Sequence, residues 1–378
     1  MNISRNRWLL IGAFALALLA LGVVLAGRHA YGTLLLFADL AHVDLPLPDH
    51  RPAFERQEAE FEVGRQRRAA DVYLPEAAVR AGLVLVPGAA EGGRRDARLV
   101  EFAEALARSG FAVVVPDVPA LRELRLTPVS VADIAAAVDF LRNGPLTAPW
   151  LGADRRVGIG AFSVAAGLAV LAALDPEPGA EVDFLLLVGG YYDLQRTLAY
   201  LTTGYYKWGH QRLEEEPDTD GKWVYALSNA PSLRRPSDRA ALGDLARARL
   251  VDPAADVEPM RARLGPDGRA VYEFIVNQDP GRVPELVGRL PAAVRADIAA
   301  LDLAGRDLAG LQAELILVHG FDDNIIPYGE SIALAAAVPR GRARLYLLQG
   351  LQHVDRDFHG LDAWRMWGAL RALMAQRD

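Results

Sequence analysis

Ser163 is a candidate nucleophile because of the turn on which the sequence places it. It follows a short apolar run that ends near Ile159, and it precedes the almost wholly apolar segment from Val164 to Leu174. A strained strand-to-helix turn lifts a serine hydroxyl above a sheet, and it needs small residues two positions before and two after the serine. Ala161 and Ala165 occupy those positions. A nearby base would be needed to activate the hydroxyl.

Two other interpretations compete for the same segment. The first is a dinucleotide-binding fingerprint that begins with Gly158 and Gly160. It is disfavoured because Ser163 stands where the fingerprint needs glycine, and because no acidic residue ends the next apolar run, Phe184 to Val188, to bind a ribose. The second is a serine that caps a buried helix, which this turn taken alone leaves open.

The chain resembles the α/β-hydrolase family, which places a serine, an acid and a histidine in this order along the sequence. The acid loop of the family looks like the segment from His319 through Gly320 to Pro327, which follows the apolar run Leu315 to Val318. The resemblance assigns the acid to Asp323, three residues beyond Gly320. Two alternatives remain, namely the neighbouring Asp322, and Asp193, where some relatives carry the acid. We expect His319 to support the loop.

The resemblance assigns the general base to His353. This residue follows the apolar run Leu345 to Leu348 by a few positions, which is where the family keeps its catalytic histidine. The chain has seven histidines, and no other one stands at such a position. In the mechanism that the resemblance implies, His353 takes the proton of Ser163 and passes it to the leaving group, while Asp323 orients the imidazole.

The same resemblance implies an oxyanion hole made of two backbone amides. The family uses the amide after the nucleophile, here that of Val164, and one from the loop after an early strand. The second maps onto Ala89, in the segment Pro87-Gly88-Ala89-Ala90. Each such donor typically contributes about 3–4 kcal/mol of transition-state stabilisation. The loop departs from the His-Gly-Gly-Gly form of many lipases and esterases.

Short apolar runs that alternate with helical patterns must position these residues. Continuous apolar strands separated by amphipathic helices predict a mostly parallel sheet covered on both faces, with ligands at the carboxyl ends of the strands. Asp96 is expected to cap a helix that contains Leu99 and Leu106, and Ser130 to Asp133 resembles a capping box. The predicted strands lie at residues 70–74, 83–86, 111–115, 156–159, 184–188, 315–318 and 345–348.

The alternation stops between Asp193 and Leu315, and we interpret this stretch as an inserted helical cap. We therefore expect a hydrolase core at residues 58–192 and 315–378, with the cap at residues 193–314. An apolar part of the substrate is expected between sheet and cap. Five aromatic residues could line that pocket or only pack the cap on the core, namely Tyr191, Tyr192, Tyr205, Tyr206 and Trp208.

The N-terminus carries an uncharged segment of twenty residues from Trp8 to Gly27. A helix of this length rises about 30 Å, enough to span a bilayer. Arg5 and Arg7 precede it, so the positive-inside rule predicts residues 1–27 as a signal anchor and an extracytoplasmic domain, periplasmic or at the cell surface. The alternative is a signal peptide cleaved after Ala26 and a secreted enzyme. Residues 28–57 are expected to form a juxtamembrane segment near the membrane surface and a linker.

Composition excludes several other classes of function. The chain has 378 residues, a formal net charge of -7 and no cysteine, so disulfides, thiolate zinc sites and a cysteine nucleophile are excluded, and nucleic acid is not expected as a partner. The sequence contains no HExxH motif and predicts neither a metal nor a cofactor. It does not predict an oligomeric state.

The predicted activity is hydrolysis of a carboxylic ester with an apolar acyl or alcohol part. A serine peptidase or an acyltransferase would use the same acyl-enzyme, and the sequence does not separate these activities. A membrane-tethered binding protein with a decayed hydrolase fold is the non-enzymatic alternative. That alternative would often have lost a member of the triad, whereas Ser163, Asp323 and His353 are all present.

Overall fold

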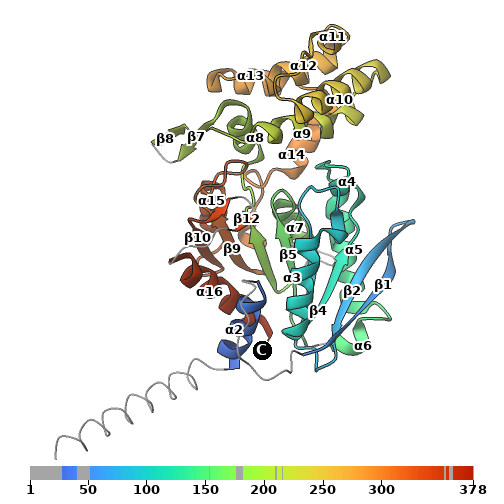
Figure 1. Cartoon of the computed structure of the whole chain (residues 1–378), viewed down its shortest axis with the longest axis vertical. Coiled ribbons are helices and arrows are strands. Elements are labelled where there is room, and N and C mark those ends of the chain that lie inside the picture. The colour runs from blue at the N-terminus through green and yellow to red at the C-terminus, as the bar shows by residue number, and fades with distance from the viewer. Residues whose placement is uncertain are drawn as a thin grey trace, which may run out of the picture.

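An eight-stranded, mostly parallel sheet forms the centre of the molecule (Figure 1). The computed structural model describes residues 28–40, 52–152, 154–175, 182–208, 211–214, 216–352, 355–356 and 361–377. In sheet order the strands are β1 (Phe54–Val63), β2 (Gln66–Pro75), β4 (Phe111–Pro116), β3 (Ala81–Val86), β5 (Val157–Phe162), β6 (Phe184–Val188), β9 (Glu314–Gly320) and β10 (Ala343–Leu348). β2 is antiparallel to β1 and to β4, and all later pairs are parallel.

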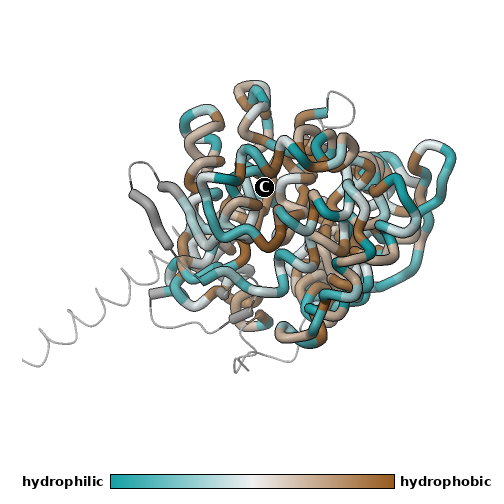
Figure 2. The backbone as a smooth tube through the Cα atoms, turned by 90° about the horizontal axis from the view of Figure 1, so that it is seen from above, coloured by the Kyte–Doolittle hydropathy of each residue, from teal (hydrophilic) through white to brown (hydrophobic). Residues whose placement is uncertain are grey.

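Helices cover both faces of this sheet, as the continuous apolar strands predict. Successive residues of one strand alternate between two cores, so that Val84 and Val86 face one side while Leu83 and Leu85 face the other. The first face carries α5 (Val129–Asn143), α7 (Ala165–Leu174) and α15 (Gly329–Ala337). The second carries α2 (Arg28–Leu40), α3 (Ala97–Arg108) and α16 (Leu361–Met374). Seen from above, hydrophobic residues lie mainly in the interior of the molecule, and hydrophilic residues lie mainly in loops at the periphery (Figure 2).

Two predictions of helix caps have different outcomes. The side chain of Asp96 accepts a hydrogen bond from the amide of Arg98 at the start of α3, as predicted. The predicted capping box from Ser130 to Asp133 is wrong. The α5 helix already begins at Val129, so both residues lie within the helix, and their side chains are buried. The Asp133 carboxylate instead accepts a hydrogen bond from Arg68 Nε at 2.8 Å, which joins α5 to β2.

Residues 32–40 of the segment expected near the membrane surface pack on the core. α2 lies against α3 and α16, where Thr33 and Leu36 are fully buried. The ring of Phe37 contacts that of Trp367 on α16 edge to face, with centroids 6.4 Å apart. Asp39 forms an ion pair with Arg108 of α3 at 3.6 Å. The α2 helix therefore belongs to the same layer of helices as α3 and α16.

The N-terminal anchor cannot be compared with the structure. The predicted span from Trp8 to Gly27 falls outside the described residues. Within the residues that are described, no helix has both the length and the apolar character that a membrane crossing requires.

The insertion between β6 and β9 forms a cap above the sheet (Figure 1). It is mostly helical, with one small hairpin of β7 (Tyr205–Trp208) and β8 (Gln211–Glu214). Its two connections to the core are held together, because the amide of Leu194 donates to Asp302 Oδ1 at 2.7 Å. The cap helices are α8 (Leu194–Thr203), α9 (Thr219–Asn229), α10 (Pro236–Val251), α11 (Glu258–Arg261), α12 (Pro266–Ile275), α13 (Val283–Arg289) and α14 (Ala292–Leu301). The remaining short helices of the core are α4 (Pro119–Arg122) and α6 (Ala148–Leu151).

Candidate active site

Ser163 stands on a strained turn between β5 and α7. Its φ angle is +55°, a left-handed conformation that residues other than glycine rarely adopt. Such strain typically costs about 1–3 kcal/mol and is concentrated at functional sites. The α7 helix has Val164 and not Ser163 at its N-cap position, which disfavours the interpretation of Ser163 as a helix cap.

Backbone hydrogen bonds connect this turn to the two neighbouring strands. The amide of Ser163 donates to the carbonyl of Val188 at the end of β6, at 2.7 Å. The amide of Gly189 in turn donates to the carbonyl of Val318 in β9, at 2.9 Å. These hydrogen bonds fix the carboxyl ends of β5, β6 and β9 side by side. A residue that follows β9 therefore lies about two strand spacings, roughly 10 Å, from the serine turn.

The loop after β3 lies directly against Ser163. A Cβ atom added to Gly88 would lie 3.2 Å from Ser163 Cβ and 3.3 Å from the carbonyl oxygen of Phe162, so glycine permits this approach. Ala89 follows at once and is half-buried beside the same serine. The structure thus brings the loop that carries Ala89 next to the serine turn that carries Val164.

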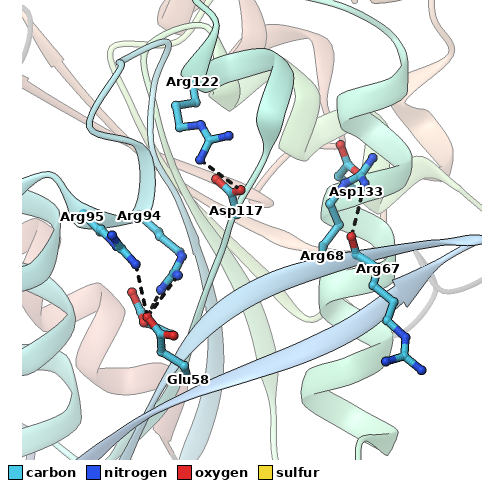
Figure 3. A network of polar contacts seen from close by, with 9 residues as sticks. Glu58, Arg67, Arg68, Arg94, Arg95, Asp117, Arg122 and Asp133 are labelled. Atoms are coloured by element: carbon cyan, nitrogen blue, oxygen red, sulfur yellow. Dashed lines mark hydrogen bonds and ion pairs between the residues drawn. The ribbon is translucent and has the colours of Figure 1, made fainter.

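A buried arginine that the sequence analysis did not identify anchors this loop at its far end. Arg94 Nη1 donates to Asp71 of β2, and Arg94 Nη2 donates to Glu58 Oε1 at 3.1 Å. Figure 3 shows Arg94 and Arg95 both reaching Glu58 on β1, although Arg95 is exposed. Asp71 is a buried acid in the otherwise apolar second half of β2, residues 69–75, and such a residue requires a partner. That rule is the signal that could have pointed to Arg94.

The acid loop after β9 is built around Asp323. Its carboxylate is buried, and its Oδ1 accepts hydrogen bonds from the amides of Ile325 at 3.0 Å and Ile326 at 2.9 Å. His319 Nε2 lies 3.3 Å from the second oxygen, Oδ2, and 2.8 Å from the carbonyl oxygen of Ile326. His319 Nδ1 lies 2.7 Å from Ser331 Oγ. These contacts place His319 among the groups that hold the loop, where we expected it.

The two alternative acids occupy different surroundings. Asp322 is exposed. Asp193 Oδ1 accepts a hydrogen bond from the amide of Arg196 at 2.8 Å, so Asp193 caps α8. Glu330 is fully buried next to Asp193, and it forms an ion pair with Arg196 at 2.6 Å. Burial, together with the Glu330 charge, raises the pKa of Tyr206 above its ordinary value. These contacts join the first cap helix to the core.

The loop after β10 touches the acid loop closely. A Cβ atom on Gly320 would lie 1.7 Å from the carbonyl oxygen of Leu351, so only glycine fits there. The buried Asp362 of α16 accepts hydrogen bonds from the amides of Gln349 at 2.8 Å and Gly350 at 3.1 Å. The predicted base His353 comes two residues after Leu351 and itself lies outside the described residues.

An apolar cavity of about 250 Å³ opens at Ser163, but it does not lie where we expected the substrate. Its described walls come from the sheet, from the loop after β3, and from α2, α3 and α16. No described residue of the cap, 193–314, contributes to them. The described walls of this cavity thus lie between the sheet and the layer of α2, α3 and α16.

The cap aromatics that are described mainly pack. Tyr191 is fully buried, and its hydroxyl donates to the carbonyl of Leu301 at 3.0 Å. The Tyr206 ring is buried and meets that of Tyr200 edge to face, with centroids 6.4 Å apart. Tyr192 and Tyr205 are half-buried, and the side chain of Trp208 is outside the described part of the chain. None of the four described tyrosines lines the cavity at Ser163.

Comparison with known proteins identifies the fold. The sequence matches no protein-family model, and no curated protein is significantly similar to it. A candidate hydrolase from Legionella pneumophila superposes with a TM-score of 0.56 at 11% identity, over 90% of this chain and 94% of its own. A mutant of the rice cell wall degrading esterase LipA from Xanthomonas oryzae superposes with a TM-score of 0.55 at 13% identity, over 91% and 93% of the two chains. The sheet order and these neighbours together show that the chain has the α/β-hydrolase fold.

Proposed function

We propose that the protein is a serine hydrolase that cleaves carboxylic esters through an acyl-enzyme. The observation that carries this proposal is the left-handed backbone of Ser163 at the turn between β5 and α7, beside the loop of Gly88 and Ala89. A helix-capping serine would not need this strain, whereas a nucleophile that must rise above the sheet does.

The proposed reaction has two steps. His353 takes the proton of Ser163 as its oxygen attacks the ester carbonyl carbon, and the alcohol then leaves with that proton. A water molecule, activated by the same histidine, cleaves the acyl-enzyme and releases the carboxylic acid. The amides of Val164 and Ala89 stabilise the negative oxygen of each tetrahedral intermediate, while Asp323 holds the imidazole and stabilises its charged form.

The acid role falls to Asp323 because of its surroundings. Its Oδ1 is held by two backbone amides, so the carboxylate has a fixed orientation on the loop after β9. This loop contacts the segment that leads to His353, through Gly320 and Leu351. Asp193 is instead engaged as a helix cap, which disfavours it as the acid.

Ester hydrolysis is preferred to the alternatives for a physical reason. The described walls of the cavity at Ser163 are mainly apolar side chains, which suit a hydrocarbon chain and present no array of donors and acceptors for a peptide backbone. An acyltransferase would share the acyl-enzyme and would use another alcohol in place of water. A binding protein without activity would not need to keep a strained serine.

We also propose that the protein is held on a membrane by the segment from Trp8 to Gly27, with the hydrolase domain outside the cytoplasm. The support is the uncharged length of this segment and the two arginines that precede it.

Labelling with a fluorophosphonate probe tests the nucleophile. Wild-type protein is expected to be labelled and Ser163→Ala is not, with a loss of kcat of about 10⁶-fold towards p-nitrophenyl esters. Ser130→Ala is the control, because this serine is buried within α5 and its Oγ makes no hydrogen bond among the described residues. Equal labelling of wild type and Ser163→Ala would exclude Ser163 as the nucleophile. A folded wild type that neither takes the label nor cleaves esters would favour the binding protein.

A further inference from the structure

We propose that the cavity beside Ser163 binds the acyl chain of the ester, a linear chain of about eight carbons or more, and that Leu40 of α2 limits its length. The inference rests on the proposed function and adds the substrate class to it. It is carried by the position of the cavity, the chemistry of its walls, its volume, and the part that an N-terminal helix takes in forming it.

The walls of the cavity suit a hydrocarbon. Phe102 on α3 meets Phe162, the residue before the nucleophile, edge to face with centroids 6.0 Å apart. The only charged side chains among the described lining residues are Asp96 and Arg98, and Asp96 is already engaged as the cap of α3. The apolar residues of the sheet and of the helices that line it are Leu40, Leu99, Phe102, Phe162, Leu186, Val188, Val318, Leu351, Met366, Ala369 and Leu370.

The volume of the cavity admits a long chain. It measures about 250 Å³. A group the size of water, such as a methylene, needs about 10–15 Å³ of such space, so a chain of eight carbons fits. An acetyl group would leave most of this space unfilled, and each methylene buried there should raise kcat/KM about fourfold, equivalent to about 0.8 kcal/mol.

The cavity is assigned to the acyl part because of where it starts. Ser163 and the loop from Pro87 to Ala90 form part of its wall, so it begins at the bond that joins substrate and enzyme. In the acyl-enzyme only the acyl group remains bonded to Ser163, whereas the alcohol must depart before water enters. A cavity walled by the sheet and three helices suits the part that stays.

Leu40 is the residue through which α2 reaches the cavity. It is the last residue of the helix, and no other described residue of α2 lines the cavity. The helix is fixed in this place by the buried Leu36 and by the ion pair of Asp39 with Arg108. A larger side chain at position 40 would therefore enter the cavity, and a smaller one would extend it.

Two ester series test the inference on the full-length protein. Ethyl octanoate and octyl acetate are isomers, and we expect kcat/KM to be at least tenfold higher for ethyl octanoate. Among p-nitrophenyl esters, kcat/KM should rise from acetate to octanoate. In Leu40→Trp the octanoate-to-acetate ratio of kcat/KM should fall at least tenfold, and in Leu40→Ala the chain length with the highest kcat/KM should be longer than in the wild type. Leu34→Trp, on the exposed side of the same helix, should leave the wild-type profile unchanged.

The outcomes separate this inference from the function on which it rests. Octyl acetate as the better isomer, or a chain-length profile that neither Leu40 variant moves, would overturn the acyl assignment while labelling of Ser163 still supported a serine hydrolase. If Ser163 of the wild-type protein were not labelled, the proposed function and this inference would both be overturned. Leu40→Ala keeps the test decisive where Leu40→Trp fails to fold.

Discussion

The left-handed φ angle of Ser163 costs conformational free energy, and a residue with a purely structural role would not need this angle. The same turn could be read in the sequence only from its small neighbours, Ala161 and Ala165. Both alanines are buried, where a larger side chain would separate the strand from the helix. The sequence therefore predicted the position of the turn, while the backbone angle, which distinguishes it from a helix cap, became visible only in three dimensions.

Substitution of Asp323 tests which of the candidate acids belongs to the predicted triad. We expect Asp323→Asn to lower kcat about 10⁴-fold, because an amide can favour the wrong imidazole tautomer and cannot stabilise the charged ring. The fold should survive, because an amide oxygen can still accept hydrogen bonds from Ile325 and Ile326. Steady-state kinetics with p-nitrophenyl octanoate measures the loss.

Two variants serve as controls for this change. Asp322→Asn alters the exposed neighbour, and Asp193→Asn replaces a helix cap by a residue that caps equally well, so each should change kcat less than threefold. A loss in Asp193→Asn as large as that expected for Asp323→Asn would move the acid to the loop after β6.

At the scale of elements, the sequence predicted best the strands that are buried on both faces. The run from Phe184 to Val188 coincides with β6, because a continuous apolar run bounded by turns leaves little choice of structure. β1 was not predicted, since its sequence FERQEAEFEV carries charges along an edge strand. The helix α2 was expected near the membrane, because no local pattern shows that its apolar side faces α3 and α16.

Contacts between distant elements were the other part that the sequence did not reveal. Arg94 and Asp71 are 23 residues apart, and Asp362 holds the turn at Gln349 and Gly350 from the start of α16. Neither contact produces a periodic pattern, so each had to be found in three dimensions. Both fix loops that carry the proposed catalytic groups.

Arg94 provides a prediction at this scale. Arg94→Ala would remove the main partner of the buried Asp71. Among the described residues this leaves the half-exposed Arg56, whose Nη2 lies 3.1 Å from Asp71 Oδ2. The loss of one member of a buried ion pair typically costs about 3–5 kcal/mol, and we expect the lower end because Arg56 remains. Urea denaturation measures this change in the free energy of unfolding.

The same change should also affect catalysis through the loop that carries Ala89. With its far end released, the second oxyanion donor is held less firmly, and kcat should fall about tenfold or more while KM changes little. Arg95→Ala is the matched control, because Arg95 contacts the same Glu58 at 3.4 Å but is 70% exposed. It should cost at most about 1 kcal/mol and leave kcat unchanged. An equal effect of both variants would show that the loop does not depend on the buried pair.

At the scale of the whole molecule, the cavity connects the proposed active site to the N-terminal end of the chain. α2 begins at Arg28, directly after the segment predicted to cross the membrane, and its last residue lines the cavity at Ser163. The helix that follows the predicted anchor is thus part of the proposed acyl site. An enzyme for apolar acyl esters would find such substrates at a membrane surface.

The proposed anchor can be tested by one charge in the uncharged segment. Full-length protein expressed in a bacterial host should sediment with membranes, resist extraction by alkaline carbonate, and be digested by protease added from outside the cytoplasm. Leu16→Arg places a charge near the middle of the segment, which costs about 3 kcal/mol of insertion free energy and should raise the extractable fraction strongly. Leu34→Arg adds the same charge at an exposed position of α2 and should fractionate like the wild type. A mature N-terminus at Gly27 would show instead that the segment is a cleaved signal peptide, and protection of the whole chain from external protease would contradict the predicted orientation.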